Sequence, residues 1–441
     1  MFSKRAIPSA TFYLLLAGFS FTLSNSRADS PDEWINASLD DLITIYRDFH
    51  AHPEVSFEEE QTANRLATHL KATGAEVQQN IGGHGVVALI KNGTGPTLML
   101  RTDLDALPVT EETGLVFASK ETVTAESGSK SGVMHACGHD VHMTNLIGTA
   151  QYLASHKDQW QGTVMLIGQP AEEKGAGAKA MLADGLFEKF PKPDFAIALH
   201  VDPYLPTGRV GYRSGYAMAN VDSVDITLQG KGGHGAYPHT TIDPVIQAAQ
   251  LVMSLQTIVS REIKPIEPAV ITVGSIHGGT KHNIIGNSCH LQLTVRSYSE
   301  EVRKHLLEAI SRKAKAVAMG AGAEEPIIDI SEGTPSLFND KELSTRIVPV
   351  FEQLLGKENA VASEPSMGGE DFSRYGRSGV PIMMYRLGSV EAKRLLRYEQ
   401  LGQKPPSLHS SLYYPDIEPT LKTGLKTMIG ASLNILSPEK P

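Results

Sequence analysis

Cysteine is scarce in this chain, which has only Cys137 and Cys289 among its 441 residues. The scarcity excludes a small scaffold held by several disulfides, and a chain of this length buries a sizeable core without any bridge. Two cysteines still permit a single disulfide in an exported protein. Cys137 lies in the stretch "HACGHDVH" (135–142), beside three histidines and an aspartate, so it could equally be a nucleophile or a metal ligand. The three assignments predict different functions.

Positive charge and long apolar runs are also in short supply. The chain has 40 Lys and Arg against 49 Asp and Glu, for a formal net charge of −9. An acidic protein is a poor candidate for binding nucleic acid or an anionic membrane surface. Beyond the N-terminus, no apolar run is long enough to span a bilayer. We therefore expect a small-molecule substrate, with neither nucleic acid nor a membrane as partner.

The N-terminus has the pattern of a secretory signal peptide. Lys4 and Arg5 precede the apolar run "TFYLLLAGFSFTL" (11–23), and two small residues spaced as at a cleavage site end the segment at Ala28. The apolar run is too short to span a bilayer comfortably, which argues against a membrane anchor. Removal of residues 1–28 would leave 37 basic against 49 acidic residues, a formal charge of −12. We predict a signal peptide and an exported mature protein, periplasmic or secreted.

The first half of the chain alternates short β-rich runs with helical stretches, which predicts an α/β domain with a mixed sheet flanked by helices. Buried strands are expected over 85–90, 97–105, 163–170 and 194–201, and helices over 38–53, 59–74, 142–157 and 177–187. The polar motifs "RTDLDALP", "QPAEE" and "ALH" lie at the ends of three of these strands. Chemistry in open α/β sheets collects at the carboxyl ends of strands, so these motifs are candidates for a functional site.

From about residue 213 the predicted elements follow the order β-α-β-β-α-β, which is the ferredoxin-like unit. Its strands are expected over 221–230, 269–278, 288–298 and 325–330, and its helices over 243–262 and 299–322. We interpret it as a compact domain inserted into the first. The predicted division is 29–212 for the first part of the catalytic domain, 213–331 for the inserted domain and 332–441 for the second part. That second part is expected to hold helices over 340–356 and 370–376, a strand over 381–388 and a last helix after Pro415, while 122–132 reads as a polar loop.

Side chains with metal-binding chemistry recur at or near predicted element ends: Cys137, His139, Glu172, Glu173, His200 and His409. The cysteine and the first histidine are two residues apart, so both could reach one ion. The adjacent glutamates follow an apolar strand, and paired carboxylates can divide metal binding and proton transfer between them. A mixed set of sulfur, nitrogen and oxygen ligands suits Zn²⁺, with Mn²⁺, Co²⁺ or Ni²⁺ as alternatives.

Each of these residues also has an ordinary structural interpretation. His200, taken alone, could be a core histidine, and Glu172 and Glu173 could stabilise the N-terminus of the following helix. Cys137 could pair with Cys289, although Cys289 lies in an alternating strand where a buried structural thiol is expected. The metal-site hypothesis therefore depends on several of these side chains meeting at strand ends.

A series of motifs runs through nearly the whole mature chain in one order: "HAHPEVSFEE" (50–59), "RTDLDALP", "HACGHD", "GQPAEE", "ALHV", "GKGGHGAYPH" (230–239), "HNIIGNSCHLQLTVRS" (282–297), "MGGEDFS" (367–373) and "LHSS" (408–411). In this order they resemble the M20 metallopeptidases, and within them the amidohydrolase branch of hippurate hydrolases, N-acyl-amino-acid amidohydrolases and indole-acetyl-amino-acid hydrolases. Thr102 and Leu104 depart from the family's usual R-A-D-M-D-A-L-P, but both changes spare the aspartates.

The resemblance implies a role for each matching residue. Two divalent ions would be held by Cys137 as the bridging ligand, with His139, Glu173, His200 and His409. Glu172 would be the general base for metal-activated water, and Asp105 would orient a ligand.

The resemblance also implies a lid and a dimer. His234 would reach the active site of the partner subunit, in a homodimer formed through the inserted domain, and would stabilise the developing oxyanion. Asn283 and Arg296, on lid strands, would contact the substrate, and Arg296 could clamp a carboxylate by a bidentate contact.

We therefore expect a metal-dependent amidohydrolase that cleaves the amide bond of N-acyl amino acids, including aryl-acyl conjugates. The near alternative is an M20-type dipeptidase or carboxypeptidase on the same site. A second class is a cysteine hydrolase, with Cys137 as nucleophile and His139 or His135 as base. A third is an exported solute-binding protein without turnover, which would have no use for Glu172.

Overall fold

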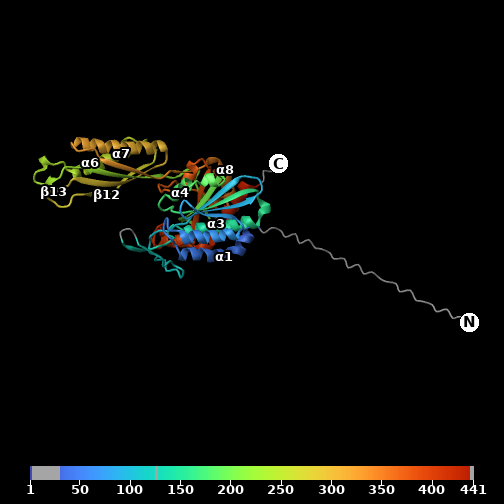
Figure 1. The fold of residues 1–441 in the computed structure, drawn as a ribbon. Coiled ribbons are helices and arrows are strands. Elements are labelled where there is room, and N and C mark those ends of the chain that lie inside the picture. Colours follow the sequence, from blue (N-terminus) through green and yellow to red (C-terminus); the bar gives the residue numbers. More distant parts are fainter. Residues whose placement is uncertain (2–29, 125–127, 438–441) are drawn as a thin grey trace.

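The computed structural model describes residues 1, 30–124 and 128–437, so the predicted signal peptide lies, apart from Met1, outside the described residues. The chain forms two bodies (Figure 1). A larger domain carries both the first and the last elements, and a smaller one extends from it.

The larger domain is built on an eight-stranded mixed sheet. Its strands, in sheet order, are β1 (Glu76–Ile81), β2 (Gly85–Asn92), β6 (Gly162–Gln169), β3 (Thr97–Asp103), β7 (Phe195–Pro206), β18 (Ile382–Val390), β8 (Val210–Tyr212) and β17 (Ala360–Ala362). The four central strands β6, β3, β7 and β18 are mutually parallel, whereas β1–β2, β2–β6 and β18–β8 are antiparallel. Parallel central strands bring their carboxyl ends to one edge of the sheet, where the polar motifs follow.

Helices cover both faces of this sheet, because its central strands are apolar on both sides. The larger core packs against α1 (Pro31–Ala51), α2 (Glu60–Ala72), α3 (His139–Ser155), α8 (Lys341–Leu355) and α11 (Ile417–Leu436). The smaller core, on the other face, packs against α4 (Gly177–Ala183), α5 (Leu186–Lys189) and α9 (Ser373–Arg377). Within the described ranges, none of the helices combines the length and apolar character that crossing a membrane requires.

The smaller domain is a four-stranded antiparallel sheet in the order β12-β14-β10-β15. Its elements are, along the chain, β10 (Asn220–Gln229), α6 (Pro244–Arg261), β12 (Ala269–Gly278), β14 (Ser288–Ser297), α7 (Glu300–Gly320) and β15 (Ile327–Thr334). Both helices pack on one sheet face, as the β-α-β-β-α-β order predicts, so the inserted ferredoxin-like domain is confirmed. β15 continues past residue 331, and the exact domain boundaries stay predictions.

Short elements complete the chain. They are the hairpin β4 (Thr122–Thr124) and β5 (Lys130–Gly132), the ribbon β11 (Gly233–His234) and β13 (Ile284–Ile285), the pair β9 (Gly215–Met218) and β16 (Leu337–Asn339), the exposed helix α10 (Ala392–Gln400), and the 3₁₀ turns Lys157–Gln159, Pro238–Thr240 and Lys357–Asn359. Figure 1 places β13 at the end of the inserted domain that is farthest from the larger domain.

Several details differ from the prediction. The first helix begins at Pro31 rather than at residue 38, because Ser30 and Glu33 form a capping box and Pro31 occupies the first helical position. The helix predicted over 177–187 is interrupted at Gly185, whose φ of 81° ends the first segment. The region predicted as a polar loop contains the β4–β5 hairpin.

Candidate metal centre

The candidate ligands come from four separate places at the carboxyl edge of the sheet. Cys137 and His139 flank Gly138, whose φ of 77° turns the chain into α3. A Cβ on Gly138 would lie 2.6 Å from the Val201 side chain, so only glycine fits this turn. His200 lies on β7, and the side chain of its neighbour Val201 packs against the turn at Gly138. The turn therefore places two candidate ligands, Cys137 and His139, opposite a third, His200, on β7.

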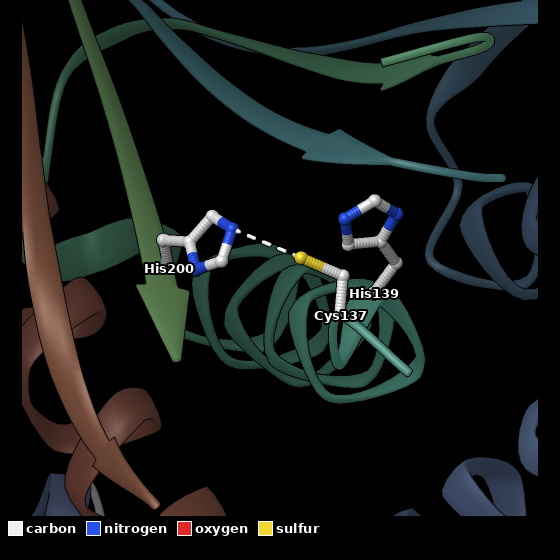
Figure 2. A group of neighbouring side chains, drawn as sticks. All are labelled: Cys137, His139 and His200. Carbon is white, nitrogen blue, oxygen red and sulfur yellow. Dashed lines mark hydrogen bonds between the residues drawn. The ribbon is translucent and has the colours of Figure 1, made fainter. Parts of the chain in front are cut away.

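Figure 2 shows the side chains of Cys137, His139 and His200 converging from the start of α3 and from β7. The Sγ atom of Cys137 lies 3.6 Å from Nε2 of His200. One potential ligand atom from each of these three residues lies within 4.8 Å of the other two, and the same holds for Cys137, Glu173 and His409. Cys137 belongs to both groups of three, the position that a bridging ligand would need.

His409 reaches the site from the far end of the chain. Its backbone adopts a φ of 66°, and its N–H donates to the carbonyl of Ala136 at 2.9 Å. Its Nε2 atom then lies 3.5 Å from Oε2 of Glu173, and its side chain is half exposed. The backbone bond to residue 136 therefore explains how a residue so distant in sequence is placed beside Cys137.

Two observations indicate that these residues fit a bound cation. In the described part of the chain, Nε2 of His139 and Oε1 of Glu173 are buried without hydrogen-bond partners, although buried polar atoms are normally paired. Burial, with the charge of Glu173, raises the pKa of the Cys137 thiol well above its ordinary value, and burial raises the pKa of Glu173 to about 7. A divalent cation would satisfy the orphaned atoms and favour the charged forms of both ligands.

Glu172 lies at the centre of this region. Burial raises the pKa of its carboxyl well above the ordinary value, and the neighbouring charges of Glu370 and Glu173 add to the effect. Its Oε2 atom lies 4.0 Å from Nε2 of His139. A carboxyl with a raised pKa beside candidate ligands is suited to accepting a proton and returning it.

Asp105 holds the two glutamates in place. Its carboxylate accepts hydrogen bonds from the backbone N–H groups of Glu172 and Glu173 at 3.1 and 3.0 Å, and from Ser56 Oγ at 2.6 Å. Nδ1 of His139 donates to the backbone carbonyl of Asp105 at 2.7 Å, which leaves its Nε2 facing the site. One aspartate thus orients three of the predicted site residues.

A buried ion-pair network that the sequence interpretation missed lies beside the site. Arg101 donates to Asp103, Glu370 and Asp371 at 2.8, 3.0 and 3.1 Å, and all four residues are buried. The guanidinium therefore pairs with all three acids but offsets only one of their negative charges, and burial raises the pKa of Asp371 to about 7. The signals were an arginine inside the apolar run "TLMLRTD" and the acidic pair in "MGGEDFS", whose partnership is visible only in three dimensions.

The other two histidines and the aspartate of "HACGHDVH" are buried, and two of the three make hydrogen bonds that hold them in place. His142 donates from Nδ1 to Asp103 at 2.7 Å and accepts at Nε2 from the Val201 N–H at 3.0 Å, so neither nitrogen is available to an ion. Asp140 bonds Nδ1 of His50 at 2.7 Å. Both nitrogens of His135 are buried without a partner among the described residues.

The predicted lid residues lie apart from this cluster within one chain. His234 is exposed on the β11–β13 ribbon, and Asn283 lies in the turn just before β13, not on a strand as predicted. The N–H of Gly235 donates to the Asn283 carbonyl at 2.9 Å, so the two regions meet at the tip. Arg296 lies at the other end of β14, where its Nη1 donates to the Met367 carbonyl at 2.7 Å.

The alternative roles for Cys137 lose support. Cys137 and Cys289 are both free and buried, and Cys289 packs in the core of the inserted domain, so the disulfide alternative is wrong. A nucleophilic cysteine needs a lowered pKa, whereas burial raises that of Cys137. The site chemistry therefore favours a ligand.

A cavity of about 320 Å³ adjoins the cluster. Its lining includes Val201 and Leu408, which are the chain neighbours of two candidate ligands, and also Met218, Met384 and Arg386. A cavity of this size can hold a small organic group.

Comparison with known proteins now identifies the family. The model of Peptidase family M20/M25/M40 matches residues 99–396. The chain is 36% identical to Thermostable carboxypeptidase 1 of Saccharolobus solfataricus, over 87% of this chain and 92% of the relative, and 35% identical to N-acetyldiaminopimelate deacetylase of Bacillus velezensis, over 88% and 97%. Among solved structures, the Bacillus subtilis YXEP protein, described as a dinuclear metal binding peptidase from the M20 family, aligns with a TM-score of 0.73 at 29% identity, over 91% and 99%. The chain therefore belongs to peptidase family M20/M25/M40 and is a metal-dependent hydrolase of amide bonds.

Proposed function

We propose that this protein hydrolyses the amide bond of N-acyl amino acids, with two divalent ions held by Cys137, His139, Glu173, His200 and His409. The observation that carries the proposal is the pair of three-residue groups that share Cys137 beside a partly buried Glu172. When bound, such ions supply Lewis-acid polarisation of a carbonyl and activation of water near neutral pH. The sulfur, nitrogen and oxygen donors favour Zn²⁺, with Mn²⁺, Co²⁺ or Ni²⁺ as alternatives.

Glu172 is the general base in this proposal. Its raised pKa allows the carboxylate to take a proton from the attacking water and to return it, as a carboxylic acid, to the departing amine nitrogen. Asp105 fixes the direction of the carboxylate by holding the Glu172 N–H. An exported solute-binding protein would need no such group, and membership in a hydrolase family leaves that alternative without support.

The lid residues complete the site from a second subunit. His234 and Asn283 are exposed at the β11–β13 ribbon. This ribbon lies at the end of the inserted domain that is farthest from the larger domain, which carries Glu172. β12 is an edge strand of the inserted sheet, and an edge strand offers unpaired backbone groups to a second copy. We place His234 of the partner subunit beside the carbonyl oxygen, where it stabilises developing negative charge. Arg296 is the proposed partner of the substrate carboxylate.

The acyl group is proposed to occupy the cavity beside His200 and His409. Its lining mixes apolar side chains, such as Val201 and Leu408, with polar ones, such as Arg386, and its volume of about 320 Å³ exceeds the needs of an acetyl group. The relative named as an N-acetyl deacetylase supports an acylated amino acid, whereas the relative named as a carboxypeptidase keeps peptides as the alternative. Export after cleavage near Ala28 stays part of the proposal on the sequence pattern alone.

A substrate panel with metal-reconstituted protein tests the proposal. Acetyl, benzoyl and indole-acetyl amino acids should be hydrolysed faster than free dipeptides, and a chelator should abolish turnover until a divalent metal is restored. Turnover that persists unchanged in the chelator would contradict the metal mechanism. Preference for dipeptides would favour the peptidase alternative on the same site.

A further inference from the structure

Two side chains of the segment 56–59, Ser56 and Glu59, are buried against the candidate site, and Glu59 has no role in the function described so far. Ser56 and Glu59 are 5% and 0% exposed, although both are polar. Glu59 precedes α2, but its carboxylate makes no capping hydrogen bond to that helix. Capping is performed by Glu54, whose carboxylate accepts from the N–H groups of Gln61 and Thr62 at 3.2 and 2.7 Å. The buried carboxylate of Glu59 therefore serves some other contact.

That contact is with the turn that carries Glu172. The N–H of Ala171 donates to Oε1 of Glu59 at 2.7 Å, across 112 residues of sequence. Ala171 has a φ of 48°, in the left-handed region that residues with a Cβ disfavour. An unfavourable backbone conformation persists only where the surroundings hold it, and the hydrogen bond from Glu59 is one such restraint.

The same segment supports the turn at a second point. Ser56 donates to Oδ2 of Asp105 at 2.6 Å, and that same oxygen accepts from the N–H of Glu173. Phe57, between Ser56 and Glu59, has a φ of 67°, so the segment also adopts a left-handed residue. Three successive N–H groups, of residues 171, 172 and 173, thus end on two buried carboxylates.

We propose that Glu59 is a positioning residue for hydrolysis, because its bond to Ala171 holds the left-handed turn from which Glu172 and Glu173 project. This inference rests on the proposed function of Glu172. It predicts an effect on the chemical step, since a small misplacement of a proton-transfer group lowers turnover more than it weakens binding.

The test compares Glu59→Ala with Glu54→Ala. Both remove a carboxylate from the same stretch, but only the first removes a bond to the turn. Glu59→Ala is expected to lower kcat by about 100-fold with KM changed less than about threefold. Glu54→Ala is expected to lower thermal stability, through the lost cap of α2, and to leave kcat unchanged.

Rescue by chemically chosen variants sharpens the test. Glu59→Gln keeps an oxygen acceptor for the Ala171 N–H and should retain most of the turnover. Glycine adopts positive φ without the Cβ penalty, so Ala171→Gly should restore part of the kcat lost in Glu59→Ala. Glu59→Asp keeps the negative charge, but its shorter side chain moves the carboxylate away from the Ala171 N–H. This variant serves in place of Glu59→Ala if the latter does not fold.

Amide hydrogen exchange gives a readout that does not need activity. Exchange at residues 171–173 should accelerate in Glu59→Ala and in Glu59→Asp, and should be unchanged in Glu54→Ala. Normal kcat with normal exchange in a folded Glu59 variant would overturn the proposal, as would equal kcat losses in the Glu54 and Glu59 variants. If the wild type hydrolyses no amide, the proposed function fails, while the exchange pattern still decides whether Glu59 holds the turn.

Discussion

In the catalytic domain, charged side chains lie buried at the carboxyl edge of the sheet, whereas on the open face of the inserted sheet they are partly exposed. Arg101 and its three acidic partners are almost fully buried. On the inserted sheet, His290 and Asp225 also form an ion pair, at 3.0 Å, but their side chains are 39% and 40% exposed. The same kinds of residue thus occupy two very different environments.

The difference bears on how each domain can contribute to catalysis. Burying a charged group is energetically costly unless an opposite charge pairs with it. The charged groups of the catalytic site must therefore be paired in the folded protein, except where a metal ion binds. Exposed residues such as His234 carry no such restriction, and they become useful only when another surface brings them to the site. In the proposed mechanism, the catalytic domain therefore supplies the preformed site, and the inserted domain supplies groups that complete it when two subunits assemble.

The largest expected effect lies in the catalytic domain, at Glu172. Glu172→Gln should lower kcat by roughly 10² to 10⁴, because the amide cannot accept the proton from water. Metal content, measured on the dialysed protein, should stay at the level of the wild type, since Glu172 is not a proposed ligand. An active Glu172→Gln protein would exclude the proposed mechanism.

Removing the buried guanidinium of Arg101 should have the next largest effect. Arg101→Leu leaves Asp103, Glu370 and Asp371 buried without their guanidinium, which should cost about 3–5 kcal/mol in the free energy of unfolding. Denaturant titration of the purified variant measures this cost. A loss below about 1 kcal/mol would show that water reaches these acids, and would weaken the contrast between the two domains.

A buried histidine should make the stability of the catalytic domain depend on pH. Burial alone lowers the pKa of His50, but hydrogen bonds to Asp140 and Glu111 outweigh it and raise the pKa to about 9. Because the folded-state value lies above the unfolded value of about 6.5, its stabilisation is complete below pH 6.5 and is lost as the pH rises through 9.

The expected loss through His50 is roughly 2–4 kcal/mol between pH 6.5 and 9.5. Unfolding free energies of the wild type and of His50→Gln, measured across this range, test it. The variant should be less stable at pH 6.5 and should show a flatter decline than the wild type. Parallel declines would mean that His50 is neutral in the folded protein.

In the inserted domain, His234→Ala should lower kcat by about 10², as expected for the loss of one oxyanion-stabilising group, without reducing stability. If His234 serves the partner's site, mixing this variant with Glu172→Gln should restore activity in heterodimers that contain one intact site. Full subunit exchange without any recovery would show that the residue acts within its own chain or not at all.

The smallest effect is expected on the open face of the inserted sheet. Asp225→Asn removes the exposed partner of His290 and should change the free energy of unfolding by less than about 1 kcal/mol. Comparison with Arg101→Leu, by the same denaturant titration, measures how strongly burial amplifies an ion pair in this protein. A cost as large as that at Arg101 would indicate that another surface covers this face.

Local patterns predicted most of the architecture. The apolar runs before "RTDLD", "QPAEE" and "ALH" are β3, β6 and β7, and the alternating segments after residue 213 are the strands of the inserted sheet. Errors concentrate where a few residues decide an element's end, such as the cap at Ser30 or the break at Gly185. Side-chain periodicity identifies a strand or helix, but it says little about where that element stops.

The candidate site was predicted in part for a similar reason. Cys137 with His139, and Glu172 with Glu173, are close in sequence, so their shared location could be expected from the sequence alone. The ion pairs of Arg101 with Glu370 and Asp371 span about 270 residues, and no local pattern reports such a contact.

By itself, the sequence determined the chemical inventory, which comprises the mixed donors, the paired glutamates, the acidic net charge and the alternation of elements. Only the tertiary structure decided which members of that inventory meet. It brings Cys137, Glu173 and His409 within reach of one another, pairs Glu370 and Asp371 with Arg101, and leaves His234 and Asn283 at the far tip. The physical reason is that residue type and spacing act along the chain, whereas burial and distance depend on strand order and packing, to which the whole chain contributes.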